Sequence, residues 1–503
     1  LLERLAAESV SEGLSKCKLM DEEAYVATKG KFLILGPSKD CVTAVSKAKK
    51  TLDDGLDSAR SAAMSKSDLY FSISLGAIVS TYKDRFLPMV MMLSAAADPE
   101  GTSIKQVVKR FEEISSFDFG LRIDDKGVNL MLLALPKEGS DLAMMTGDEK
   151  NSEDSFLKTL PKEKFLIAFG GNVLKSEHSE KFGSNSPIAD VVKMTGGGEE
   201  RDAKAVETLD KAVNKLHKLL SSYAVSISSL PEGSEGLFGA AIVAQTTDAK
   251  EFVEGVRKAY EAAWKISKSE EVTTAKEGII HTADAESAAG GKVDTIKFDI
   301  KALAELTKTG EEDIKKVEQL LGKDFTIRFG AVDDKHFVLS FGGGKKRYES
   351  VCSAVKSSGD PLSSDSGIAD LSSQLHTPRG GEFYAAVDNI AQTIKTVFKA
   401  VGEEEEFPFD VPTINAPLAA SSAVVGKVSR VDVVVPMKLI KAVKEAYEKY
   451  AAAAAEEDFD EGGDSDEDSA ASDEEEEAPA KAKKSAGKSK SKKEEPKDEE
   501  SES

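Results

Sequence analysis

Residues 223–265, YAVSISSLPEGSEGLFGAAIVAQTTDAKEFVEGVRKAYEAAWK, decide the fold class of this chain. Two apolar runs flank the turn signal Pro-Glu-Gly at 231–233, which predicts an antiparallel hairpin. A helix is then expected from Asp248, because Glu251 follows it at capping-box spacing. Its apolar residues form one stripe that faces a sheet: Phe252, Val253, Val256, Tyr260 and Trp264. This stretch therefore predicts a hairpin followed by an amphipathic helix.

Similar hairpins recur along the chain. Runs rich in Val, Ile and Phe, broken by Gly, Asp and Lys, occupy 24–35, 119–135, 325–341 and 423–435, and helices are expected after the first, third and fourth of them. A parallel α/β fold would alternate single strands with helices instead. We therefore expect an α+β protein whose twisted, mostly antiparallel sheets are covered by helices.

A larger recurrence favours two related halves. Strand 69–73 feeds a helix through Leu87, and 383–387 feeds a helix through Val401. Three matched pairs follow one another in the same order about 300 residues apart: Tyr70 with Tyr384, Phe32 with Phe337, and Gly120 with Ser421. Chance similarity between diverged segments is the alternative explanation. The predicted ranges are a first unit at 1–150, a middle hairpin-helix unit at 151–285, a second related half at 286–455 and a tail at 456–503.

The tail concentrates the charge. Residues 456–503 carry 20 acidic and 8 basic side chains, out of a net charge of −22 for the chain. An acidic block at 456–477 is followed by a lysine-rich block at 481–493, and neither offers apolar surface to bury, so we expect disorder. A solubilising extension, capture of basic proteins, and attraction of nucleic acid or anionic surfaces all stay open. Ser465 and Ser472 precede acidic runs and suit an acid-directed kinase.

The glycine run FGGGKKR at 341–347 is the nearest approach to a ligand motif. Backbone amides at Gly342, Gly343 and Gly344, followed by Lys345, offer a weak anion-site candidate at a helix start. The run fails the Walker pattern, because Lys346 stands where Ser or Thr is required. A strand-to-helix turn explains the same glycines. A second run, TGGGEE at 195–200, places carboxylates beside its glycines and is interpreted as a linker.

Other catalytic and metal patterns are not found. The five histidines form no metal-ligand pair: His178, His217, His281, His336 and His376. No G-x-S-x-G elbow occurs, which argues against a common serine hydrolase. The acidic pairs at 124–125 and 333–334 lie in hairpin turns, where Asp is favoured for local hydrogen bonds. We therefore expect no catalytic residue, no metal site and no cofactor.

Cysteine, methionine and hydropathy set further limits. Cys17, Cys41 and Cys352 cannot all pair. Cys41 and Cys352 fall on expected helices, where small buried thiols explain them, and a single Cys17–Cys41 bridge stays open. Eight of ten methionines precede residue 146, which suits either core filling or an adaptable apolar groove. No run of 18 apolar residues occurs, so no transmembrane helix is expected, and 86–97 is interpreted as a buried helix.

The opening LLERLAAESV predicts a helix without a preceding strand. A cleaved leader, a shortened gene or a trimmed chain all explain that start. With the strand-helix segment DLYFSISLGAIVSTYKDRF and the hairpin at 223–265, it resembles uncharacterised, signal-peptide-bearing bacterial proteins of planctomycetes and their relatives. The resemblance implies a periplasmic, envelope or secreted location and supplies no functional residues. The charged tail departs from it and leaves a cytoplasmic location as the alternative.

The function expected from the sequence is therefore binding or structural, without catalysis. The leading prediction is a component of a bacterial envelope that holds a protein or an apolar ligand. An intracellular chaperone-like protein with an acidic tail is the alternative, and an enzyme with a site assembled from distant residues is the second alternative. No specific nucleic-acid binding is expected.

Overall fold

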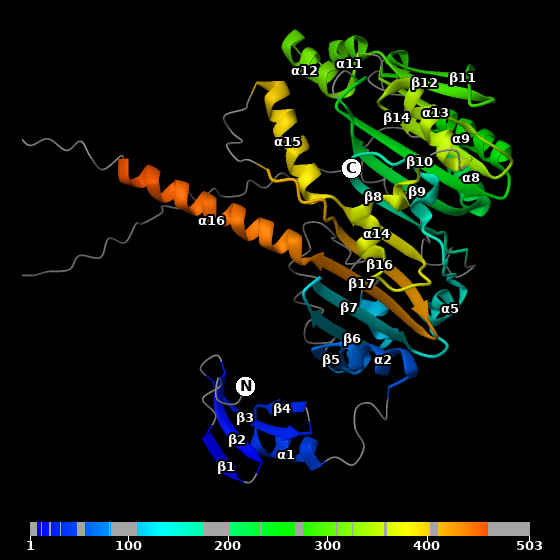
Figure 1. The fold of residues 1–503 in the computed structure, drawn as a ribbon. Coiled ribbons are helices and arrows are strands. Elements are labelled where there is room, and N and C mark those ends of the chain that lie inside the picture. The colour runs from blue at the N-terminus through cyan, green and yellow to red at the C-terminus, as the bar shows by residue number, and fades with distance from the viewer. Residues whose placement is uncertain are drawn as a thin grey trace, which may run out of the picture. The chain divides into compact units, whose positions relative to one another are not determined.

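A computed structural model describes residues 8–47, 56–81, 108–175, 202–266 and 275–460, with short gaps at 12, 20–21, 31, 80, 232–233, 308–309, 324, 357–359 and 403–410 (Figure 1). The chain divides into two compact units, Leu1–Glu448 and Lys449–Ser503. The predicted buried helix at 86–97, the linker at 195–200 and residues 461–503 of the predicted tail lie outside the described residues.

The first described strands form a four-stranded antiparallel meander. They are β1 (Glu8–Ser11), β2 (Leu14–Leu19), β3 (Glu22–Lys29) and β4 (Phe32–Gly36), followed by helix α1 (Lys39–Lys47). Val42 of α1 packs on Leu14 and Ala27 of this sheet. The helix predicted over 1–10 is wrong for residues 8–10, which lie in β1. There, antiparallel pairing with β2 overrides local helix propensity.

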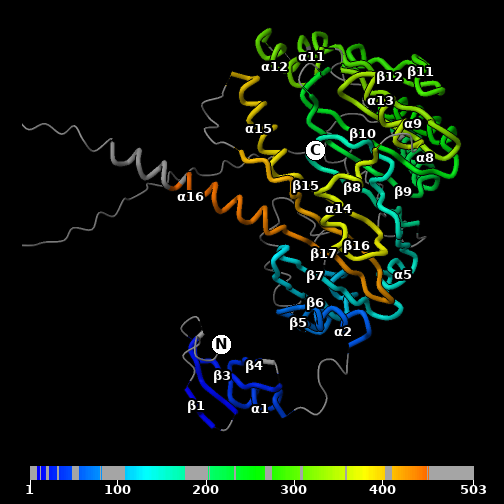
Figure 2. Tube along the Cα trace, viewed as in Figure 1, coloured from blue at the N-terminus to red at the C-terminus, as the bar shows by residue number. Residues whose placement is uncertain are grey.

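Thirteen further strands form one larger sheet (Figure 1). In chain order they are β5 (Leu69–Ile73), β6 (Ile114–Ile123), β7 (Gly127–Pro136), β8 (Phe165–Asn172), β9 (Leu220–Ser229), β10 (Phe238–Thr246), β11 (Ile279–Ala288), β12 (Gly291–Phe298), β13 (Thr326–Ala331), β14 (His336–Phe341), β15 (Gly381–Ala385), β16 (Leu418–Val425) and β17 (Val428–Pro436). Their order across the sheet is β11-β12-β13-β14-β10-β9-β8-β15-β16-β17-β7-β6-β5. Figure 2 shows how this order brings distant segments together, as where β17 lies beside β7.

Helices connect these strands. They are α2 (Ser58–Lys66), α5 (Asp141–Asp148), the 3-10 turn η2 (Phe156–Thr159), α8 (Ala203–Leu219), α9 (Ala249–Ala263), α11 (Ile300–Thr307), α12 (Glu311–Leu321), α13 (Gly344–Val355), the 3-10 turn η3 (Leu362–Ser364), α14 (Ser366–Ser372), α15 (Val387–Val401) and α16 (Met437–Asp460). Residues of η2, α13, η3 and α14 pack on one sheet face around the buried Tyr384 of β15. Residues of α8 and α9 pack on the opposite face around Phe337 of β14. The sheet is therefore sandwiched between helices over its central strands.

The α+β class and the antiparallel sheets are confirmed, because every strand pairing in both sheets is antiparallel. Each predicted hairpin is present. Helix α9 also begins as predicted, since the Asp248 carboxylate accepts a hydrogen bond from the Glu251 amide at 2.9 Å. The sequence prediction did not include strand β8 or the hairpin β11–β12.

The division into three ranges stays a prediction. Strands from all three ranges share the large sheet, and the boundary predicted at residue 285 falls inside β11. Within the residues that the structure describes, no helix combines the length and the hydropathy needed to cross a bilayer.

The order of the large sheet alternates in a regular way. The strands fall into four groups that are consecutive in the chain: the four strands β11–β14 and the three-strand groups β8–β10, β15–β17 and β5–β7. The groups meet through their last strands at β14·β10 and β17·β7, and through their first strands at β8·β15. Junctions between last strands therefore alternate with a junction between first strands. The series ends at β5, which is the first strand of its group and the last strand of the sheet.

Candidate functional site

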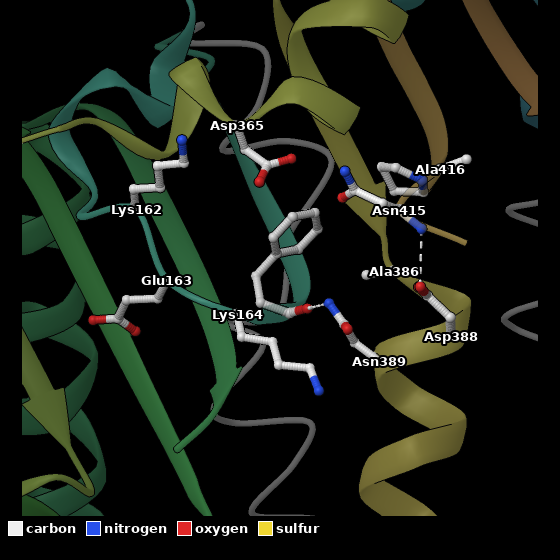
Figure 3. A pocket seen from close by; sticks show the side chains of 11 residues that line it. Lys162, Glu163, Lys164, Asp365, Ala386, Asp388, Asn389, Asn415 and Ala416 are labelled. Carbon is white, nitrogen blue, oxygen red and sulfur yellow. Dashed lines mark hydrogen bonds between the residues drawn. The ribbon is translucent and has the colours of Figure 1, made fainter. Parts of the chain in front are cut away.

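A polar cavity of about 370 Å³ lies beside the start of β8 (Figure 3). Its wall is formed by the segment entering β8, the starts of α14 and α15, and the loop before β16. The lining residues that matter here are Lys162, Lys164, Asp365, Asp388, Asn389 and Asn415. It gathers charged side chains from segments that are distant in sequence, and it is therefore the first place to look for chemistry.

Two of the three carboxylates that line this cavity, Asp388 and Asp365, hold backbone in place. The buried Asp388 accepts hydrogen bonds from the backbone amides of Ile414, at 2.7 Å, and Asn415, at 3.0 Å. Asp365 accepts hydrogen bonds from the amides of Gly367 and Ile368 and so caps α14. The third, Glu163, forms an ion pair with the buried Arg347 at 2.8 Å. Each carboxylate therefore has a structural task, which argues against a role as a general acid or base.

The remaining polar groups of the cavity suit weak binding. The Lys164 ammonium donates to Gln392 at 2.7 Å, and the Asn389 amide donates to the carbonyl of Phe165 at 2.9 Å. Lys162 and Asp365 also line the cavity (Figure 3). No nucleophile paired with a base lines the described walls of this cavity. It offers a small polar ligand a few hydrogen bonds, and it provides no catalytic arrangement.

The glycine run predicted as an anion site lies at the start of α13. Gly342, Gly343 and Gly344 all have positive φ, between 65° and 68°. A Cβ on Gly342 would lie 2.1 Å from the Phe238 carbonyl oxygen, so close packing on the β9–β10 hairpin requires glycine there. A Cβ on Gly344 would lie 2.6 Å from a carboxylate oxygen of Glu235. A carboxylate of the chain itself therefore lies where an anion would approach, and anion binding at these residues and Lys345 stays a prediction.

A buried ionic network lies on β15. The Glu382 carboxylate is fully buried and accepts hydrogen bonds from the Ser155 hydroxyl and the Phe156 amide, both at 2.6 Å. Arg379 donates to the same carboxylate at 3.2 Å, and burial raises the pKa of the neighbouring Tyr384. Because its members satisfy one another away from water, the network fixes the strand and η2 rather than meeting a substrate. In the sequence, the local sign of this network is the segment Arg-Gly-Gly-Glu at 379–382.

A second ionic network stabilises the β11 end of the sheet. The Arg257 guanidinium of α9 donates to both oxygens of the buried Asp294, at 2.7 and 2.6 Å. His281 lies 2.9 Å from the same carboxylate, and the backbone amide of Asp284 donates to it at 2.9 Å. Burial favours the neutral form of Asp294, yet these hydrogen bonds outweigh it and hold its pKa below the usual range. The network ties the edge strand to the sheet.

At the opposite end, β5 presents an apolar edge. Leu69, Phe71 and Ile73 alternate along it and expose 45%, 53% and 42% of their surface. Among the described residues β5 pairs with β6 alone, in an unbroken register from Leu69 opposite Leu121 to Ile73 opposite Phe117. Unpaired backbone groups beside exposed apolar side chains are what an added strand requires.

The other sequence candidates lie apart. Asp124 and Asp333 accept hydrogen bonds from backbone amides two and three residues ahead, as the turn interpretation predicted. Cys352 is buried, which raises its pKa to about 11, whereas Cys41 is exposed, contrary to the expectation of a small buried thiol. Among the described histidines, His281 and His336 each contact a different aspartate. No group of three metal-ligating side chains is found in the described part of the chain.

Comparisons of the chain with protein-family models, with curated proteins and with solved structures give no match. The function is therefore argued from the geometry of these sites alone.

Proposed function

We propose that this protein is a non-enzymatic binding component that holds a protein partner at edge strand β5. The observation that carries the proposal is the row of Leu69, Phe71 and Ile73 beside an edge with no partner strand among the described residues. Natural proteins usually protect such edges with charges, bulges or proline. An unprotected apolar edge is the surface on which a partner strand adds to a sheet.

The contacts around β5 support a preformed binding surface. Phe71 packs on Phe119 of β6, with ring centroids 6.2 Å apart. On the opposite face of this end of the sheet, Ala63 of α2 packs on Met131 and Leu133 of β7. The strand is thereby held in an extended conformation before any partner arrives, which reduces the entropic cost of binding.

For location we propose the cell envelope or the extracellular space, as the resemblance to signal-peptide-bearing bacterial proteins implies. Native mass spectrometry of the protein isolated from its own cells tests this, because it determines the true N-terminus and any retained partner together. A processed N-terminus in an envelope fraction supports the proposal. An unprocessed chain in the cytoplasm that carries basic proteins supports the acidic-tail alternative instead.

The test of binding at β5 uses a phage-displayed library of random peptides selected on the whole protein. Peptides with alternating apolar residues should be enriched, since alternate side chains of an added strand face the same side. Bound peptides should lose at least about tenfold in affinity, which corresponds to about 1.4 kcal/mol, on the variant Phe71→Lys. Ile280→Lys is the matched control, because Ile280 is 53% exposed on β11 at the other edge.

Two results oppose the proposal. Enriched peptides that bind Phe71→Lys as well as the unchanged protein place the binding surface elsewhere. Equal losses for Phe71→Lys and Ile280→Lys indicate a general effect of added charge rather than a site at β5. The polar cavity beside β8 then becomes the next candidate, and Lys162→Ala tests it with the same peptides.

A further inference from the structure

We infer that the partner strand at β5 is β5 of a second copy of this chain, so that two large sheets join into one. This inference rests on the proposed binding function of β5 and names the partner. It is argued from the way the strand groups already meet inside the chain.

The internal junctions predict the kind of strand that β5 accepts. From β11 to β5 the strand groups meet three times. The last strands meet at β14·β10, the first strands at β8·β15, and the last strands again at β17·β7. The next junction in this alternation is first strand to first strand. Because β5 is the first strand of its group, a second β5 continues the pattern and closes it around a two-fold axis.

The β8·β15 junction shows that two first strands fit together in this fold. They pair antiparallel over five positions, from Gly381 opposite Gly171 to Ala385 opposite Ile167. Phe383 lies opposite Phe169 near the middle of this junction. Strand β5 has the same length as β15, and Tyr70 is the residue that the sequence comparison matched with Tyr384.

The chemistry of β5 allows it to meet its own copy. The sequence Leu-Tyr-Phe-Ser-Ile carries no charge, so two copies do not repel each other. The neighbouring carboxylate of Asp68 accepts a hydrogen bond from the Ile123 amide at 2.8 Å, which directs it toward β6. The register with β6 contains no bulge that would turn the outer edge away.

Full overlap of the two strands fixes their register. An antiparallel pair of five-residue strands overlaps completely only when the middle residues face each other. Phe71 therefore lies opposite Phe71 of the second copy, and Leu69 lies opposite Ile73. Cross-strand apolar pairs of this kind stabilise antiparallel sheets. Since the edge is short, we expect a weak dimer, with a dissociation constant of about 1–100 µM.

The experiment is sedimentation velocity of the full chain across that concentration range. We expect the unchanged protein and Ile280→Lys to dimerise alike. Phe71→Lys places two like charges opposite each other, and the dimer should weaken at least about tenfold. Each variant should keep its unfolding midpoint, because both side chains are about half exposed. A monomer at all concentrations, or a dimer unaffected by Phe71→Lys, overturns the inference.

Cysteine pairs test the register directly. The background is Cys41→Ser, because Cys41 is the exposed cysteine and Cys17 and Cys352 are buried. A mixture of Leu69→Cys and Ile73→Cys chains should form disulfide-linked dimers under mild oxidation, faster than either variant by itself. Equal rates for the mixture and the single variants contradict the antiparallel register.

The two proposals can fail separately. A chain that stays monomeric but binds selected peptides at β5 overturns the second-copy partner and leaves the binding function standing. A chain that neither dimerises nor binds peptides through β5 overturns both.

Discussion

The two edge strands of the large sheet, β11 and β5, differ in how their outer backbone groups and side chains are arranged. At β11 the register with β12 is broken between Thr282 and Glu286, and Asp284 adopts a positive φ of 51°. Its backbone amide turns to the Asp294 carboxylate, and its side chain pairs with Arg257. At β5 the register is unbroken and the side chains are uncharged.

The difference shows which edge is closed and which is available. A bulge with ionic side chains disfavours further pairing, because an incoming strand finds no flat edge there and the Asp284 amide already donates to Asp294. The β5 edge has neither feature. We interpret β11 as the terminus of the sheet and β5 as its binding edge, and the following predictions test this contrast.

The largest effect is expected from breaking the ionic network behind β11. Asp294→Ala leaves the half-buried Arg257 without its main partner and removes the acceptor for the Asp284 amide. The free energy of unfolding should fall by about 3–5 kcal/mol, as for other broken buried ion pairs. Denaturant titration measures this. Glu254→Ala is the control, because its exposed ion pair with Arg257 should contribute less than about 1 kcal/mol. Equal losses for both variants contradict the proposed role of Asp294.

Lowering the pH should destabilise β11 before it destabilises β5. Hydrogen bonds hold the pKa of Asp294 below its usual value. The Lys292 ammonium and Arg257 lower the pKa of the exposed Asp284. A carboxyl group with a lowered folded-state pKa stabilises the fold above the unfolded pKa, about 3.9 for Asp, and that contribution is lost as pH falls further. The hydrogen-exchange protection factors of β11 amides, which are corrected for the intrinsic exchange rate at each pH, should therefore fall below about pH 4, while those of β5, which carries no carboxylate, change less. An equal fall in the protection factors of both strands contradicts the contrast between the two edges.

A smaller effect is expected from the charged C-terminal segment. Deletion of 461–503 removes acidic and lysine-rich blocks that are distant in sequence from β5. If β5 forms the dimer, its dissociation constant should change by less than about threefold, since screened charges contribute little at physiological salt. Sedimentation of the shortened chain at two salt concentrations checks this. Complete loss of association on deletion supports binding through the tail instead.

The smallest effect is expected at the closed edge. Ile280→Lys adds a charge to a strand that already carries His281 and Asp284, on a half-exposed position. The free energy of unfolding should change by less than about 0.5 kcal/mol. The dimer constant should change by less than about twofold, since β11 takes no part in the proposed interface. A stronger effect than that of Phe71→Lys reverses the assignment of the two edges.

Short-range signals in the chain were enough to predict many of its local elements. Asp248 with Glu251 predicted the start of α9, and the aspartates at 124 and 333 predicted two turns, because these signals act within three residues. Apolar runs broken by turn residues likewise predicted five hairpins and the α+β class. These hairpins lie at 24–35, 119–135, 223–244, 325–341 and 423–435. The same local reasoning failed at Glu8–Val10, where pairing with a neighbouring strand decides the conformation.

Which strands are neighbours, and which described strands lie at the two ends of the sheet, became visible in the folded chain. Asp388 accepts hydrogen bonds from the amides of Ile414 and Asn415, and Glu382 accepts one from Ser155. These contacts, and the place of β5 at the end of the sheet, involve segments far apart in the chain. The physical reason is that strand pairing and buried ionic networks derive their free energy from non-local contacts. No local window of sequence contains both partners of such a contact, so the candidate sites became visible only in the folded chain.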